Sequence, residues 1–424
     1  MRSCRFSLRS RESSSRSTVV SPVLPLLRFA RVCSTQSRNA EPVRSRSRAT
    51  APTVRPSSRT IRTAWALNSS VNCRRGRRVG VSAAIEDIVS AFQKVSTGSG
   101  HAQRVPFESQ RFRGCADLDR MRREVDFVAL LDGMRTMFNE VLAREQSIPS
   151  ALPHPHPVHF DYVDSNESNA IAVRCDQHRF IGVTIHYVRD AWTMCSTLAA
   201  SLKSPSLFGL DADHESREGL AAALFRLQLT YVVCHEYAHH LNGDMADSGL
   251  FMEHGGPMQG NIQSQVREMH ADGIAVFLCL RQLLLHDERQ HILLVIGRKT
   301  LDEDRQDELL ISLLIVAIGA RIYRPVSIAL DETNAYAATH PAAAARMNFV
   351  MRDVQQWCTH NRIRLVEWVT IDLFQKLMHG IDQVLADGKG KRWAQQTAFL
   401  QSSDGAVYME ILHAAFNRRL EERS

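Results

Sequence analysis

Residues 231–241 read YVVCHEYAHHL and contain the pattern H-E-x-x-H. Side chains four positions apart lie on one face of a helix, so the imidazoles of His235 and His239 can bind one metal ion. Glu236 adjoins the first of these ligands and can act as a general base on a metal-bound water. The flanks are apolar and an Asn-Gly pair follows, which is typical of a helix end. The pattern therefore predicts a buried helix with a zinc site; the alternative is a helix with two unrelated histidines.

A second segment offers the ligand that this site still lacks, because a catalytic zinc site needs a third protein ligand and an open position for water. Glu268 and Asp272 are four residues apart in an apolar segment, 263–285, and share a helix face. Their pattern, E-x-x-x-D, resembles the second motif of the gluzincin metallopeptidases. The resemblance implies that Glu268 binds zinc and that Asp272 accepts the free ring N–H of a histidine ligand. The alternative is an exposed acid pair.

The run E-x-x-A-D at residues 268–272 also resembles the CaaX-type prenyl proteases and the related bacterial heat-shock peptidases. Those families carry T-H-P with an Arg six residues after the His, and this chain has Thr339-His340-Pro341 and Arg346 at that spacing. The resemblance implies that His340 and Arg346 stabilise the oxyanion that forms when an amide is attacked. The alternatives are a residue at a helix start for His340 and a surface charge for Arg346.

The membrane spans usual in those proteases are not expected here. No apolar run reaches the roughly 18 residues of a membrane-spanning helix. The longest, residues 309–320, has twelve residues and fits a buried helix. A gluzincin without transmembrane segments, similar to the phage-exclusion peptidases of bacteria, is therefore an alternative resemblance, and prenylated or membrane substrates are not implied.

The N-terminal segment differs in composition from the rest of the chain. Residues 1–80 hold 18 Arg, no Lys and two acids, whereas the remainder holds 34 basic and 43 acidic side chains, a net charge of −9. We expect residues 1–80 to be disordered, as a transit peptide, a polyanion-binding tail or a segment upstream of the true start. The folded part, residues 81–424, is mildly acidic, so we expect no nucleic-acid binding by it.

The nine cysteines are scattered without a C-x-x-C pair, which indicates buried thiols and a reducing compartment. We therefore expect a cytoplasmic protein. An organelle is the alternative if residues 1–80 are a transit peptide.

Periodicity predicts an α+β fold that is mostly α. Strands are convincing only within residues 158–188, at 159–163, 169–174 and 180–187. We expect a zincin-like core with a small sheet beside the active-site helix, and a C-terminal helical subdomain from about residue 286. The expected helices cover residues 82–95, 117–145, 190–202, 217–242, 263–285, 289–299, 306–322, 341–361, 364–387 and 404–421. The expected loops cover residues 203–216, 243–262 and 331–340.

These patterns together predict a zinc-dependent endopeptidase that acts on a protein or peptide substrate, with a strand of residues 158–188 pairing with the substrate backbone. The rival function is a non-catalytic zincin-fold interaction module, which would bind metal without turnover. The sequence leaves the oligomeric state open.

Overall fold

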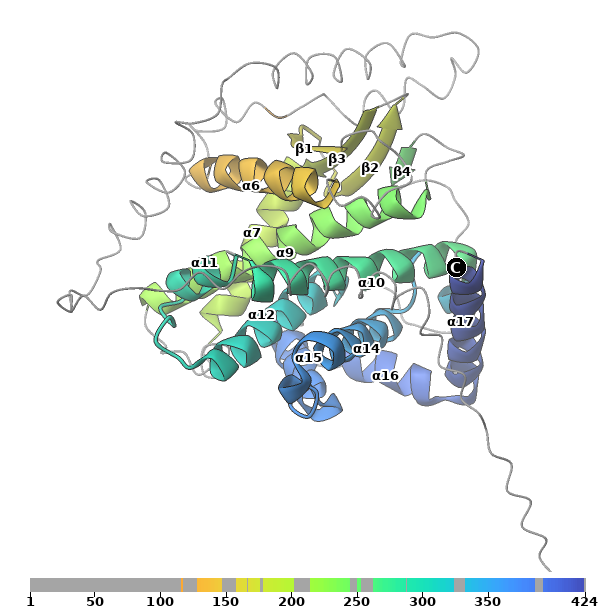
Figure 1. The fold of residues 1–424 in the computed structure, drawn as a ribbon. Helices are drawn as coiled ribbons and strands as arrows, with labels where there is room; N and C mark the ends of the chain where they lie inside the picture. The colour runs from red at the N-terminus through yellow and green to blue at the C-terminus, as the bar shows by residue number, and fades with distance from the viewer. Residues whose placement is uncertain are drawn as a thin grey trace, which may run out of the picture.

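The fold is α+β and mostly α, as predicted, with one small sheet (Figure 1). The structure is a computed structural model. It describes Ala116 and residues 128–146, 158–165, 167–175, 178–201, 214–244, 250–252, 262–286, 288–323, 332–385 and 392–422. The segment 1–80, the expected helix 82–95 and most of the loops 203–216 and 243–262 lie outside the described residues.

The sheet has four strands in the order β1-β3-β2-β4. They are β1 (Val158–Val163), β2 (Ala170–Cys175), β3 (His178–Thr184) and β4 (Leu250–Met252). β1 is parallel to β3, and β2 is antiparallel to both β3 and β4. The short strand β4 lies within residues 243–262, where we expected only a loop. It pairs with Ile171–Val173 of β2, because an exposed strand edge readily accepts another strand.

The third strand ends earlier than predicted, at Thr184 instead of residue 187. The hydroxyl of Thr184 accepts a hydrogen bond from the backbone N–H of Tyr187, 3.2 Å away, and so caps the helix α7 (Ile185–Ala200). Ile185 therefore belongs to this helix and not to the alternating face of the strand. The cap decides the boundary, because apolar alternation alone does not distinguish the two structures over a few residues.

The outer edge of β1 is closed by side chains of the helix α6 (Val128–Gln146). The carboxamide of Asn139 bonds both the N–H and the C=O of Phe160, and that of Gln146 bonds both groups of Val158. With β4 on the outer edge of β2, the outer edges of both β1 and β2 have partners over these stretches. The pairing of a strand of residues 158–188 with a substrate remains a prediction.

The helix α9 (His214–Asn242) lies at the centre of the molecule. Nearly every side chain between Leu220 and His240 is buried. Burial on all sides is typical of a helix enclosed by other elements. The helix packs against α7, the strands β2 and β3, and the later helices α10 (Ile262–Leu285) and α12 (Glu303–Tyr323).

The remaining helices are α11 (Glu288–Val295), α13 (Glu332–Ala337), α14 (Ala343–Asn361), α15 (Ile371–Leu385), α16 (Arg392–Gln401) and α17 (Ser403–Glu421). Of these, α14, α15, α16 and α17 lie on the side of α9 away from the sheet (Figure 1). No helix of the described ranges is long and apolar enough to cross a membrane.

Several boundaries differ from the prediction. α11 stops at Val295 because Gly297 adopts a positive φ of 68° and ends the helix. The expected helix 364–387 begins only at Ile371, after a short 3₁₀ turn at Ile363–Leu365. α13 and α16 were not predicted, and both are short.

Candidate metal centre

The predicted ligands meet where the last turns of α9 lie beside the first turns of α10. The Nε2 atoms of His235 and His239 are 3.2 Å apart. The carboxylate of Glu268 lies 3.2 Å from Nε2 of His235 and 3.6 Å from Nε2 of His239. All three residues are at least 97% buried. Within the described ranges, they form the one group of three or more such side chains that could hold a metal ion, with ligand atoms within 4.8 Å of one another.

Both imidazoles are oriented through their second nitrogen. Nδ1 of His235 lies 2.9 Å from Oδ1 of Asp272, as predicted for a partner that fixes the ring. Nδ1 of His239 lies 3.0 Å from Oδ2 of Asp244. The contact of His239 with Asp244 is a hydrogen bond, whereas that of His235 with Asp272 is an ion-pair contact. An ionised carboxylate can only accept, so both contacts favour the tautomer with the proton on Nδ1. In the neutral rings, both Nε2 lone pairs then point into the same space as the carboxylate of Glu268.

This convergence fits a bound cation. Two lone pairs and one negative charge in a buried volume repel one another unless a positive charge lies between them. Burial would lower the pKa of His235, but the hydrogen bonds to Asp272 and Glu268 raise that pKa well above its ordinary value. The surroundings therefore favour positive charge at this point, and two imidazoles with one carboxylate form a donor set suited to a divalent metal.

Asp272 is held by two further groups. The guanidinium of Arg346 donates to both of its oxygens, at 2.8 and 2.7 Å, and the hydroxyl of Tyr231 donates to Oδ1. Burial acts to raise the pKa of Asp272, but the charge of Arg346 and the hydrogen bonds from His235 and Arg346 hold it below its ordinary value. Asp272 thus stays ionised and remains an acceptor for His235.

Arg346, for which we predicted a role in stabilising an oxyanion, lies against Asp272. Arg346 is 5% exposed, and both donors of its fork are engaged by Asp272. Stabilisation of an oxyanion requires donors aimed at that oxygen, whereas the fork of Nε and Nη2 is aimed at Asp272. Arg346 therefore has the geometry of a positioning residue for Asp272, and the spacing in the sequence could not distinguish these two roles.

His340 reaches the centre from the segment between α13 and α14. Its Nε2 lies 3.3 Å from Oε2 of Glu268, and its side chain is 17% exposed. Burial opposes the ionisation of Glu268, but the nearby charge of His340 and the contact with His235 hold the pKa of Glu268 well below its ordinary value. His340 is thus beside the candidate ligands, as predicted, and it is more exposed than any of them.

Glu236 follows the first histidine ligand on α9 and is completely buried. A carboxylate in this position is costly unless it serves a neighbouring group. Its role as a general base remains a prediction.

We did not predict a role for Asp244, although the sequence contains a feature that indicates one. Gly243 has a positive φ of 67°. Its N–H bonds the carbonyl of His240, and the N–H of Asp244 bonds the carbonyl of His239. These two bonds form a Schellman motif, which turns the chain back over the last helical turn. The turn brings the carboxylate of Asp244 to His239, so the Asn-Gly-Asp run after the helix pointed to this residue.

The other cysteines and histidines add no metal ligands in the part of the chain described. Cys195, Cys234, Cys279 and Cys358 are free and buried, which matches the expected buried thiols. Cys234 adjoins His235 but is not among the three ligands.

Comparison of the chain with protein-family models, curated proteins and solved structures gave no match. The residues of the site alone therefore carry the functional argument.

Proposed function

We propose that this chain is a zinc-dependent peptidase whose metal ligands are His235, His239 and Glu268. The observation that carries the proposal is the convergence of two oriented imidazoles and one carboxylate in a buried volume. Two histidines and one glutamate form the ligand set of several zinc peptidases. The choice of a peptide bond as substrate depends on the motif resemblance.

The mechanism assigns a task to each side chain. Zinc, when bound, would lower the pKa of a coordinated water to about 7 and polarise the substrate carbonyl. Glu236 would take a proton from the attacking water and return it to the leaving amine. His340, partly exposed beside Glu268, would donate a hydrogen bond to the carbonyl oxygen as charge develops there. Asp272 keeps the proton of His235 on Nδ1, and Arg346 holds Asp272.

Zinc content and hydrolysis of an unfolded protein, measured on the full chain, test this proposal. We expect about one zinc per chain in the parent. Glu268→Ala should lose most of it, because the third ligand is removed. Glu236→Gln should keep the metal but lose about 10²–10⁴-fold in hydrolysis, because the base is removed while its shape is preserved. Glu140→Gln, an exposed change on α6, is the matched control and should alter neither quantity.

The other outcomes are equally informative. Zinc retained by Glu268→Ala would displace Glu268 as a ligand. Zinc in the parent without turnover of any peptide would favour the interaction module. A parent that binds no zinc and hydrolyses nothing would contradict the proposal.

A further inference from the structure

The last helix of the chain, α17, packs against the segments that carry the candidate metal centre. It lies across the end of α10 at which that helix begins (Figure 1). A second hydrophobic core, separate from the main one, joins α17 to α10, α13 and α14. Its buried members are Val266, Met269, Ala335, Ala342, Ala345, Phe349, Tyr408, Leu412, Phe416 and Leu420.

Polar contacts of α17 extend to the same segments. The hydroxyl of Tyr408 donates to Oε1 of Gln265 on α10 at 2.7 Å and accepts from the N–H of Ala342 at 3.2 Å. Gln265 donates in turn to the carbonyls of Ala335 and Ala338, at 2.7 and 2.9 Å. Tyr408 thus links the helix of Glu268 to the segment on either side of His340.

Arg419, also on α17, reaches the metal centre more directly. Its guanidinium forms an ion pair with Oδ1 of Asp244, while Oδ2 of Asp244 lies 3.0 Å from Nδ1 of His239. The side chain of Asp244 is fully buried, and that of Arg419 is 17% exposed. Asp244 therefore lies between an arginine and a candidate ligand.

The two histidines thus have equivalent supports. His235 is held by Asp272 and Arg346, and His239 is held by Asp244 and Arg419. In each case an arginine contacts the carboxylate and fixes its orientation beside a histidine. The carboxylate then keeps the proton on Nδ1 and leaves Nε2 free for metal.

We propose that Arg419 is a positioning residue for His239, acting through Asp244, so that the C-terminal helix completes the metal centre. This inference rests on the proposed function, since it concerns the same zinc site. In this arrangement, Arg419 supports His239, a candidate metal ligand that lies 180 residues earlier in the sequence. Proper docking of α17 is then a condition for tight metal binding.

The dissociation constant for zinc, measured by competition with a chromogenic chelator, tests the inference on the full chain. Arg419→Met should weaken zinc binding about 10–100-fold, the usual effect of losing a residue that orients a ligand. Arg418→Met is the matched control, because Arg418 has the same charge on the same helix but is exposed. It should leave the dissociation constant unchanged. Equal dissociation constants for the two variants and the parent would overturn the inference.

A double-mutant cycle with Asp244→Asn distinguishes positioning from a general loss of structure. If Arg419 acts through Asp244, Arg419→Met should weaken zinc binding by less than about threefold once Asp244 is already Asn. Full additivity of the two changes would overturn the inference.

Two further measurements keep the result interpretable. Thermal unfolding in the presence of a chelator reports the stability of the fold without bound zinc. If Arg419→Met does not fold, Arg419→Lys keeps the charge, and the cycle is repeated with that variant.

If the parent binds no zinc, the proposed function fails together with this inference. If the parent binds zinc and the Arg419 variants bind it equally well, only this inference fails.

Discussion

Asp353, on α14, is a buried carboxylate whose surroundings differ from those of the two that support the histidines. It is 2% exposed, and its closest cation, Arg352, lies 3.7 Å from Oδ1. Its Oδ2 lies against Gly273 of α10, where a Cβ would come within 2.9 Å of it. Burial raises the pKa of Asp353 to about 7, Arg352 opposes this shift, and the negative charge of Asp272 adds to it. Ionisation of Asp353 in the folded protein is therefore unfavourable near neutral pH.

Asp353→Asn should change the pH dependence of stability. The folded-state pKa of about 7 exceeds the ordinary aspartate value of 3.8, so the carboxyl favours the folded state below pH 4 and this contribution is lost as the pH rises through 7. Asn cannot ionise. We expect the variant to be more stable than the parent at pH 8, by at most about 4 kcal/mol, and the advantage to vanish at pH 4. Denaturant unfolding at the two pH values measures this, with the exposed Glu410→Gln as the control. An equal difference at both pH values would contradict the assignment.

At the scale of elements, α6 protects the edge of the sheet by means of side-chain amides. Asn139 and Gln146 bond alternate residues of β1, much as a neighbouring strand would. The N–H of Ala116 continues the pattern by bonding the carbonyl of Tyr162 at 2.8 Å. An edge closed in this way does not recruit another strand, so it resists edge-to-edge association.

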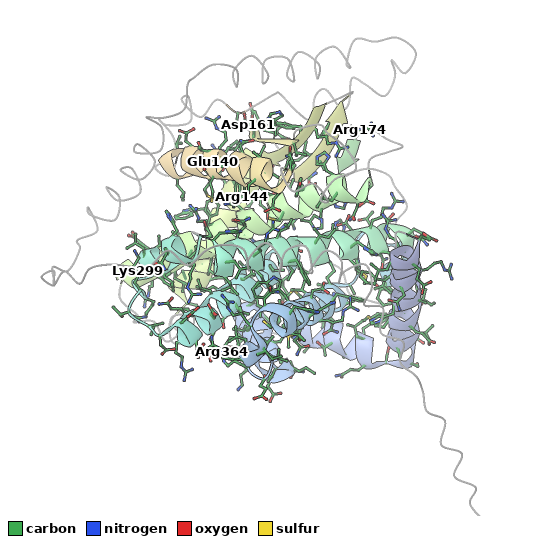
Figure 2. All side chains as sticks on the ribbon, viewed as in Figure 1. Glu140, Arg144, Asp161, Arg174, Lys299 and Arg364 are labelled. Atoms are coloured by element: carbon green, nitrogen blue, oxygen red, sulfur yellow. The ribbon has the colours of Figure 1, made fainter. Side chains whose placement is uncertain are left out.

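Asn139→Ala tests this closure. The change leaves the N–H and C=O of the largely buried Phe160 without their partner, and an unsatisfied buried group costs about 1–3 kcal/mol. We expect the free energy of unfolding to fall by that amount. Glu140→Ala, an exposed change on the same helix (Figure 2), should change it by less than about 0.5 kcal/mol. If the two variants have the same free energy of unfolding, the carboxamide of Asn139 does not stabilise the edge of β1.

The elements that the sequence predicted well are those with a repeating local pattern. The apolar spacing and the Asn-Gly stop located α9 to within a few residues, and H-E-x-x-H with E-x-x-x-D identified the three side chains that meet at the centre. Contacts between distant segments could not be predicted in this way. The pairing of Arg346 with Asp272 and of Arg419 with Asp244 depends on how helices dock, and no local periodicity encodes that.

At the scale of the whole molecule, the described residues form two hydrophobic cores of unequal size. The larger surrounds α9, whereas the smaller is completed only by α17, at the end of the chain. The smaller core holds the first turns of α10, so the metal centre lies where both cores meet. We expect the region around α17 to open with a lower free energy than the region around α9, because it has far fewer buried apolar side chains.

Phe416→Ala tests this difference between the cores. Phe416 is 3% exposed and stacks on His270 of α10 with ring centroids 4.3 Å apart. Truncation of a buried Phe lowers the free energy of unfolding by about 3–5 kcal/mol, and we expect it to destabilise the smaller core. Hydrogen exchange followed by mass spectrometry, in the presence of a chelator, should show faster exchange in α17 and the first turns of α10 and no change in α6 or the sheet.

Val407→Ala, at a site 51% exposed on α17, should leave all of these rates unchanged. Faster exchange throughout the protein would mean instead that the two cores unfold as one cooperative unit, and that α17 cannot separate from the metal centre without the loss of the whole fold.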